Sequence, residues 1–583
     1  GDSGTVDVKF TGSVTGDRDR GEGVFAASWS AGGNSDAVKL DLDGDVSIEG
    51  RYSRGMRAAS ISNSLDGNNP GYSSGDVTVS FDGVLNVGAA SNSRSDALNA
   101  VGLLVESETG LDEASSGDSG NINIDINGAI NVGSSYAHGL HAVTYTTGLS
   151  LNQELGHSGD LSVNVNGPIT LTGNESTGVL LESGLDGSKY VRSYGKSGDI
   201  DLSVIGDIKV LSDFDPRTDV NSYEGSTRFM RGVHARSVAD KNDSGDIEID
   251  IIGDIVANGV HYSDFYDPKE ASGGVIALSS TNIPEGFSWP DDVSDAPYVS
   301  SVISAGQVDI THKGNIEVIG SGVSGLSATS LINQVGDAGN VSVDSVGDIT
   351  LKNTKINTGT NTGIEALSRN KGTYGDAGNV SIKHVGNLEL DAIDPWMFSR
   401  ALAYGFTATS WKHGYSGRSG NVSVDLEGDY TYIPGPDQIY HDTYIVNAES
   451  LGPYSSGDVS LSHKGNVNYT LAGYPAFEAE SHRRFMPGYF GDFPNNSAGA
   501  VVVNLEGDYV FNATPSFYTG GRQNTAIRAI SKVDFSVART ATVGPVTVNL
   551  KGSLTSSALF DERYAGITGL AALTRSDQNA NLG

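Results

Sequence analysis

Apolar and polar residues alternate in short segments along the whole of this chain. In the segment 159–167, Gly-Asp-Leu-Ser-Val-Asn-Val-Asn-Gly, apolar side chains occupy every second position. Two further short apolar segments follow at 168–173 and 178–183. A period of two that is rich in β-branched residues is typical of half-buried strands. We therefore expect three short strands between Gly159 and Ser183.

The same three-strand pattern recurs from residue 4 to residue 574. A glycine follows the first strand of each unit, and the spacing between these glycines varies from 44 − 12 = 32 to 314 − 253 = 61 residues. Three short strands cannot bury a hydrophobic face alone, whereas stacked units can. The repeat predicts an all-β fold, a right-handed parallel β-helix of about 14 coils with long loop insertions. The glycines are Gly12, Gly44, Gly83, Gly128, Gly167, Gly206, Gly253, Gly314, Gly347, Gly386, Gly428, Gly465, Gly507 and Gly552.

The third strand is the most uniform part of the repeat and reads Gly, apolar, any, Ala, any, Ser or Thr. Its alanine predicts a tight corner in which larger side chains would clash. Its final hydroxyl predicts a hydrogen bond to the turn backbone, because so many equivalent nucleophiles make no chemical sense. The hydroxyl residues are Ser28, Ser60, Ser107, Thr144, Ser183, Ser237, Ser279, Ser330, Ser368, Ser410, Ser450, Ser481, Ser531 and Thr574.

The residue after the first-strand glycine forms an Asp/Asn column that raises the question of calcium. Stacked carboxylates about 4.8 Å apart repel one another by about 0.9 kcal/mol per pair even in water, so they need cations or neutral neighbours. From Asp254 onward the column alternates Asp with Asn, which favours a structural ladder that caps turns. If Ca²⁺ binds, the candidate ligands are the adjacent Asp207 and Asp254, with Asp199 and Asp246 at the entry to the first strand.

The composition limits the possible partners. The formal net charge is -34, and such a surface repels nucleic acid and anionic membranes. The chain has no cysteine, so stability must come from stacking and hydrogen bonds rather than disulfides. No apolar stretch is long enough for a transmembrane helix, so we expect no membrane insertion by this segment.

Long insertions between strands are the expected place for binding, because repeat scaffolds concentrate binding in loops on one face. Two insertions are rich in aromatic and charged residues that could contact a glycan or a protein partner. The alternative is that these loops fold over their own aromatic side chains and bury them. The candidate contact residues are Trp289, Asp291, Asp292, Arg483, Arg484 and Phe490.

No catalytic motif is present. Phosphate loops, nucleophile elbows and metal-binding histidine spacings are all missing. A glycosidase needs two carboxylates at a defined separation, and acidic residues are too abundant here for any pair to be informative. We expect no catalysis and no cofactor other than possible Ca²⁺. The alternative is a polysaccharide lyase or hydrolase, which two converging carboxylates beside an Arg or Lys on neighbouring coils would favour.

The repeat resembles that of autotransporter-type passenger domains of Gram-negative bacteria. The resemblance rests on units such as Ser-Gly-Asp-Leu-Ser-Val-Asn-Val-Asn-Gly-Pro-Ile-Thr-Leu at 158–171, followed by Gly-Val-Leu-Leu-Glu-Ser at 178–183. It implies a β-helix at the outer cell surface or shed from it, often adhesive. The resemblance covers nearly the whole chain, although the glycine runs that often follow the third strand are replaced here by mixed loops.

The sequence therefore predicts an extracellular structural or adhesive surface protein that binds a glycan, a protein or other copies of itself. The alternative assembly is a surface layer or extracellular filament, with or without dependence on Ca²⁺. We expect residues 1–583 to form a single continuous β-helix segment of a longer chain, with an incomplete C-terminal tail at 575–583.

Overall fold

The fold consists of β-strands in the residues that the structure describes, and no helix occurs among them. The structure is a computed structural model. It describes residues 1–16, 19–63, 71–88, 100–110, 117–134, 136–146, 156–173, 176–186, 191–192, 195–211, 230–240, 242–260, 272–281, 303–321, 323–333, 335–353, 360–392, 401–413, 416–434, 441–471, 475–484, 496–513, 524–534, 541–558 and 567–576.

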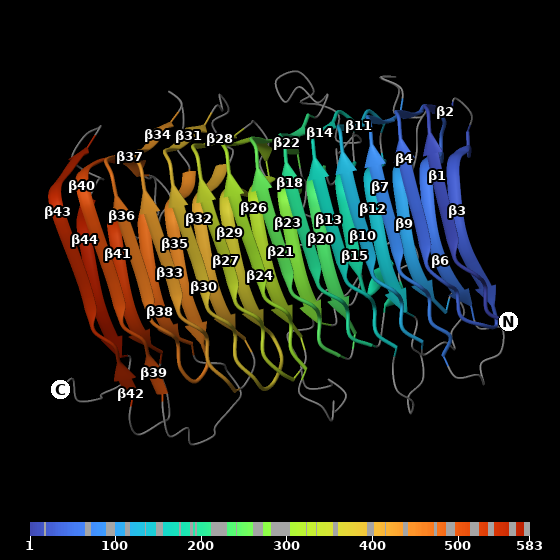
Figure 1. Ribbon diagram of the computed structural model, residues 1–583. Coiled ribbons are helices and arrows are strands. Elements are labelled where there is room, and N and C mark those ends of the chain that lie inside the picture. The colour runs from blue at the N-terminus through green and yellow to red at the C-terminus, as the bar shows by residue number, and fades with distance from the viewer. Residues whose placement is uncertain are drawn as a thin grey trace. The chain divides into compact units, whose positions relative to one another are not determined.

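The chain separates into two compact units, which are described one at a time. Unit 1 contains the described residues between 1 and 257 and between 272 and 311, and unit 2 contains residues 258–260 and the described residues from 312 onward. In each unit, equivalent strands of successive coils lie side by side and parallel (Figure 1). The predicted all-β parallel β-helix is confirmed, whereas its continuity over residues 1–583 stays a prediction.

Unit 1 is built from three sets of parallel strands. The first-strand set is β1 (Val6–Thr11), β4 (Val38–Asp43), β7 (Val77–Asp82), β10 (Ile122–Asn127), β13 (Leu161–Asn166), β18 (Ile200–Ile205) and β21 (Ile247–Ile252). The second-strand set is β2 (Val14–Gly16), β5 (Val46–Ile48), β8 (Leu85–Val87), β11 (Ile130–Val132), β14 (Ile169–Leu171), β19 (Ile208–Val210) and β22 (Ile255–Val260). The third-strand set is β3 (Glu22–Ala31), β6 (Arg54–Asn63), β9 (Val101–Thr109), β12 (His138–Thr146), β15 (Thr177–Ser183), β20 (Arg231–Ala239) and β23 (Ser272–Thr281). A short antiparallel pair joins β16 (Leu185–Asp186) and β17 (Val191–Arg192).

Unit 2 repeats this arrangement. After β24 (Val308–Lys313), its first strands are β27 (Val341–Val346), β30 (Val380–Val385), β33 (Val422–Glu427), β36 (Val459–Lys464), β40 (Val501–Ala513) and β43 (Val546–Ala558). Its second strands are β25 (Ile316–Ser321), β28 (Ile349–Asn353), β31 (Leu388–Ala392), β34 (Tyr430–Pro434) and β37 (Val467–Leu471), and then the continuations of β40 and β43. Its third strands are β26 (Val323–Ile332), β29 (Thr360–Asn370), β32 (Ala401–Lys412), β35 (His441–Gly452), β38 (Phe477–Arg483), β41 (Asn524–Val533) and β44 (Ile567–Ser576). A further parallel pair is formed by β39 (Asn496–Ala498) and β42 (Ala541–Val543).

The alternating pattern places one face of each strand in the core. In β10 the side chains of Ile122, Ile124 and Ile126 are buried, while the intervening polar residues are exposed. The partner strand β13 is paired without a register shift, so apolar residues stack on apolar residues from coil to coil. Register is specified strongly because a slip by one residue would turn the apolar face outward.

The hydroxyl column of the third strand binds the turn backbone, as predicted. The Ser237 hydroxyl donates to the carbonyl of Gly198 at 3.0 Å and accepts the N–H of Gly245 at 2.9 Å. The Ser410 hydroxyl does the same with Gly378 and Gly420, at 2.8 Å each. These side chains are fully buried, so each satisfies backbone groups that would otherwise be unpaired away from water.

The first-strand glycines are required by their backbone. Gly44 has φ +143° and Gly206 has φ +155°, a region that side chains with a Cβ rarely adopt. A Cβ at Gly206 would lie 2.3 Å from the carbonyl oxygen of Gly167 in the neighbouring coil. The column therefore brings successive turns into direct backbone contact.

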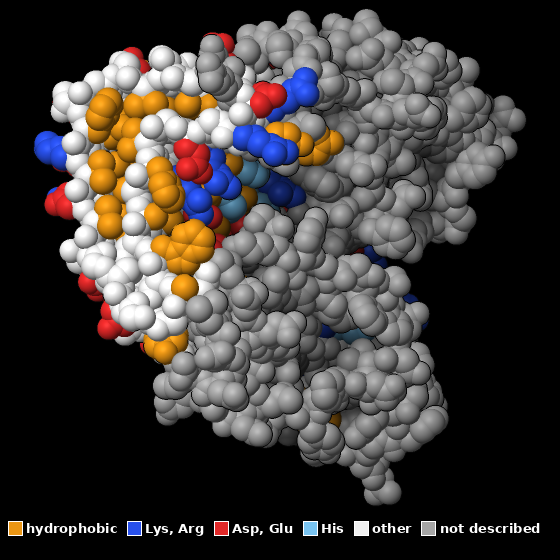
Figure 2. All heavy atoms as spheres, turned by 90° about the vertical axis from the view of Figure 1, so that its right-hand side faces the viewer, with side chains coloured by type: hydrophobic (Ala, Val, Ile, Leu, Met, Phe, Trp, Pro, Cys, Tyr) orange, Lys and Arg blue, Asp and Glu red, His pale blue; other side chains and the backbone are white. Residues whose placement is uncertain are grey.

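Large hydrophobic side chains are exposed on the side of unit 1 that carries β1 and β3. Phe25 is 50% and Trp29 is 63% exposed there, whereas Phe81 in the strand interior is 1% exposed. Figure 2 views this side and shows hydrophobic side chains beside a group of charged residues. Among the described strands, β3 pairs only with β6, so the outward residues of β3 have a neighbouring coil on one side only.

Candidate functional site

The four aspartates proposed as calcium ligands lie in two ladders in unit 1. The N–H of Asp246 donates to Oδ1 of Asp199 at 2.8 Å, and the N–H of Asp254 donates to Oδ1 of Asp207 at 3.1 Å. The Nζ of Lys209 donates to the other oxygen of Asp207 at 2.9 Å. The hydrogen bond from Lys209 has the largest effect on the pKa of Asp207 and lowers it. The bond from the Asp254 N–H lowers it further. The side chains of Asp199 and Asp207 therefore help to hold the next coil.

In unit 2 the alternating Asp/Asn column makes the same bonds. The N–H of Asp348 donates to Asn315 at 2.9 Å, and the N–H of Asn387 donates to Asp348 at 2.8 Å. The predicted structural ladder is thus confirmed. No group of three or more His, Cys, Asp or Glu side chains with metal-binding geometry occurs among the described residues. Calcium binding at the four aspartates stays a prediction.

Of the six candidate contact residues in the insertions, only the two arginines lie among the described residues. Trp289, Asp291, Asp292 and Phe490 lie outside the described residues. Arg483 is 3% exposed and its Nε donates to the carbonyl oxygen of Pro453 at 2.8 Å, which is a structural role. Its neighbour Arg484 is exposed, so of the two arginines only Arg484 presents its side chain to solvent.

Unit 2 gathers three glutamates on the outer face of its third-strand set, where the sequence analysis had not placed a site. Glu449 of β35 is in register with Glu480 of β38, and Glu478 lies two residues earlier on β38. We call Glu449, Glu478 and Glu480 the acidic group. Neighbouring strands lie about 4.8 Å apart, so these carboxylates are close together.

Cations surround the acidic group without neutralising all of it. Arg528 of β41 pairs with Glu478 at 2.6 Å, and Lys532 of β41 pairs with Glu480 at 3.0 Å. His482 Nδ1 also lies 2.9 Å from Glu480 Oε1. The Glu449 side chain forms no hydrogen bond or ion pair with another described residue.

The acidic group separates the pKa values of its members. Burial and the charges of Glu478 and Glu480 raise the pKa of Glu449 to about 7. Burial also acts to raise the pKa of Glu480, but the contacts of that residue with His482 and Lys532 outweigh it and lower the pKa to about 2. Two neighbouring carboxyl groups with pKa values pushed apart are the arrangement that acid catalysis uses.

A group of positive charges lies on the same outer face. The guanidinium carbon of Arg369 lies 4.0 Å from the ring centre of Trp411, and that of Arg484 lies 5.9 Å from it. His413 packs edge-on against Trp411 with ring centres 5.3 Å apart. We call Arg369, Trp411, His413 and Arg484 the basic group. Arg484 also acts electrostatically on Glu449, so the acidic and basic groups adjoin.

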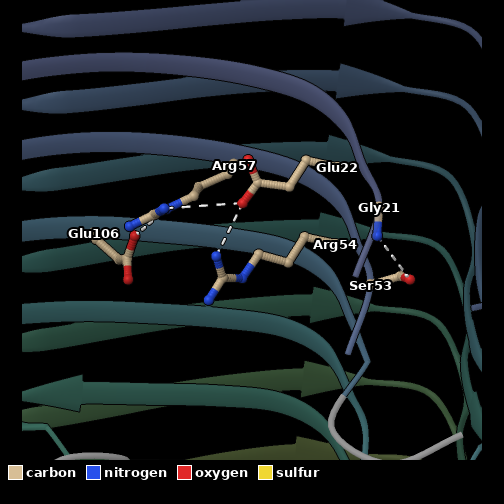
Figure 3. Close-up of polar contacts among 6 residues, drawn as sticks. All are labelled: Gly21, Glu22, Ser53, Arg54, Arg57 and Glu106. Atoms are coloured by element: carbon tan, nitrogen blue, oxygen red, sulfur yellow. Dashed lines mark hydrogen bonds and ion pairs between the residues drawn. The ribbon is translucent and has the colours of Figure 1, made fainter. Parts of the chain in front are cut away.

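Unit 1 has charges at equivalent positions, but there they are matched in pairs. Arg54 and Arg57 contact Glu22 at 2.9 and 3.9 Å, and Arg57 binds Glu106 at 2.6 Å (Figure 3). Further along, Glu182 is fully buried and binds both Arg236 and His141. These pairs join neighbouring coils and stabilise their register.

A sequence signal for these charges exists at one position of the third strand, between its Ala and its Ser or Thr. Most units carry a small, apolar or uncharged residue there, such as Ala59, Val143 or Leu367. Exceptions with a charged residue are Glu106, Glu182, Arg236, Glu449 and Glu480. Charged residues at an otherwise uncharged position would have indicated the outer-face clusters.

Lys412 is a buried cation beside the basic group whose effect on stability is testable. It is 1% exposed, and its Nζ donates to Asn370 Oδ1 at 2.9 Å and to the carbonyl oxygen of Gly372 at 2.5 Å. Burial lowers its pKa from 10.5 to about 7. The folded protein therefore holds fewer protons than the unfolded chain between these pH values, and the free energy of unfolding should rise with pH.

We expect this rise to be at most about 1.4 kcal/mol per pH unit, the limit for one proton. It is measured by urea unfolding at about pH 7.5 and about pH 9.5, with the K412M variant as the comparison. The variant should lose the pH-dependent difference. An equal slope in the variant and the parent protein would contradict a depressed Lys412 pKa.

The described residues contain no helix of the length and hydrophobicity that a membrane-spanning segment requires. The chain matches no protein-family model, and neither a curated protein nor a solved structure matches it.

Proposed function

We propose that this chain is an extracellular surface protein, structural or adhesive, built as a scaffold of stacked β-helix coils. One observation supports the proposal most. Polar side chains that recur along the described coils, such as Ser237 of the hydroxyl column and Asp199 and Asp348 of the ladders, form hydrogen bonds between or within coils. The repeat therefore serves the scaffold, and binding is left to residues that do not recur.

The outer surface of a Gram-negative bacterium is the proposed location, from the resemblance of the repeat to autotransporter-type passenger domains. The proposed partners are a glycan or protein at a cell surface, or other copies of this chain. Such scaffolds present non-repeated residues on a rigid, extended surface.

The test is binding of the purified chain, immobilised on beads, to a glycan array and to a set of extracellular matrix proteins. We expect saturable binding to at least one of them, without chemical change of the ligand. Sedimentation velocity at two protein concentrations, with and without chelator, runs in parallel. Growth of the particles with concentration would support a filament, and dissociation by chelator would support calcium dependence. Absence of both ligand binding and self-association would overturn the proposal.

A second candidate function is a polysaccharide-active enzyme, and the acidic group favours it. Glu449 and Glu480 lie on neighbouring strands in register, one with a raised and one with a lowered pKa, beside Arg484 and Lys532. Here Glu449 would act as the acid and Glu480 as the ionised carboxylate. Incubation with a panel of polysaccharides tests this candidate. Release of reducing ends that E480Q abolishes would support it, and no release would exclude it for that panel.

A further inference from the structure

The basic group is unusual because its arginines have no carboxylate partner among the described residues. Many described Lys and Arg side chains pair with an acid, as Arg54, Arg57 and Arg528 do. Among the residues that the structure describes, Arg369 and Arg484 form no ion pair. The buried Nε of Arg369 has no hydrogen-bond partner in the described part of the chain. In a chain with a formal net charge of -34, carboxylate partners are abundant, so unpaired arginines at this place need an explanation.

The fold holds these arginines near one indole ring. Arg369 of β29 is in register with Trp411 of β32, and Arg484 follows the end of β38, two coils further on. The two guanidinium groups thus approach Trp411 from opposite directions along the sheet. Stacking on an aromatic ring orients a guanidinium while leaving its N–H donors directed sideways.

The charges of the basic group add to one another. The pKa of His413 is lowered by burial and then by the charges of Arg369, Lys371, Lys412 and Arg484. Arg369 itself has a pKa lowered to about 10 by burial. Positive charge is therefore concentrated at this place, and an anion would relieve the repulsion. Charges beyond about 8 Å are largely screened at physiological salt, so the negative charge of the whole chain does not prevent local anion binding.

We propose that the basic group binds the oxyanion groups, sulfate or carboxylate, of an acidic polysaccharide. The Arg369 and Arg484 guanidinium groups would donate paired N–H bonds to the oxygens, a geometry that suits both kinds of oxyanion. Trp411 would hold the two arginines in place and contact the apolar face of a sugar ring. This inference rests on the proposed binding function and gives the chemical class of its ligand.

The experiment is isothermal titration calorimetry of the full chain with heparin, polygalacturonate, dextran and inorganic sulfate at low salt. We expect heparin or polygalacturonate to bind and the neutral dextran not to bind. R369Q and R484Q should each weaken binding about 10-fold, because each removes a charge-assisted contact. At about pH 8, above the pKa of Glu449, E449Q should strengthen binding, because it removes a negative charge that acts on Arg484.

The matched control is K464Q, which removes one positive charge in unit 2 from an ion pair with Glu427 at 2.8 Å. Its binding should stay within a factor of about two of the parent protein. Circular dichroism and thermal melting of each variant show whether it is folded. If K464Q weakens binding as much as R484Q, binding reflects overall charge and the proposal is wrong. Sulfate binding as strong as heparin binding would make the site one for a free ion.

Failure of both polyanions to bind would also overturn the proposal. The scaffold function would survive that result if the chain still binds neutral glycans or matrix proteins on the arrays. It would fail together with this inference only if no ligand and no self-association were found. The two conclusions are therefore tested separately.

Discussion

The G44A substitution is expected to prevent the neighbouring coils of unit 1 from stacking and to destabilise the protein by about 4 kcal/mol or more. Gly44 follows β4 with φ +143°, which strains any residue with a Cβ. In addition, a Cβ at this position would lie 2.2 Å from the carbonyl oxygen of Gly12 and 2.6 Å from its carbonyl carbon. Backbone on both sides is held by interstrand hydrogen bonds, such as that from the Gly44 N–H to Asp82 at 2.8 Å, so neither side can move away freely.

The G12A variant is the matched control. Gly12 has nearly the same backbone conformation, φ +142°, but its added Cβ would meet only the Phe10 ring, at 3.4 Å. It should therefore cost only the conformational strain, about 1–3 kcal/mol. Thermal and urea unfolding of both variants measure the difference. Equal losses in G12A and G44A would show that strain alone, and not the contact between coils, requires the glycine column.

The E182A substitution should cost about 3–5 kcal/mol, because it leaves a buried cation without its partner. Glu182 is 0% exposed, and its Oε2 lies 3.0 Å from Nε2 of His141 while Oε1 contacts the Arg236 guanidinium. The free energy of urea unfolding is the measurement. A loss below about 1 kcal/mol would show that water or a rearranged side chain compensates the Arg236 charge.

A double variant separates the value of the pair from the cost of an unpaired charge. Replacing Glu182 and Arg236 together by leucine should recover most of the stability lost in E182A, since buried ion pairs are often worth little against apolar residues of similar size. The free energy of unfolding at acidic pH gives a second measurement of the contribution of Glu182. The pKa of Glu182 is held well below 4.5 by Arg236 and His141, against the effect of burial. Its contribution is therefore present above pH 4.5 and lost as the pH falls below that value.

Adjacent residues show where sequence reasoning reached its limit. Arg483 and Arg484 both belong to one predicted contact set, because they stand together at the start of a long insertion. The strand alternation of β38 continues to its end, so Arg483 turns inward to the carbonyl oxygen of Pro453 while Arg484 turns outward. The outer-face position of Glu449, Glu478 and Glu480 follows from the same alternation. Only the stacking of the coils brings their three carboxylates close together.

The strands, the side-chain columns and the positions of the first-strand glycines could be predicted from the repeat alone. These features depend on local periodicity and on one contact that is repeated between coils. The same residue type therefore recurs at the same place in successive units, as Gly44, Gly206 and Ser237 illustrate. The tertiary structure decided which non-repeated side chains meet. Arg369 and Arg484 come to the same indole although more than two coils separate them in the chain, and Glu182 reaches Arg236 across an insertion. Insertions of unequal length separate such residues, and their encounter depends on strand register and on stacking, which bring distant parts of the chain within a few ångströms.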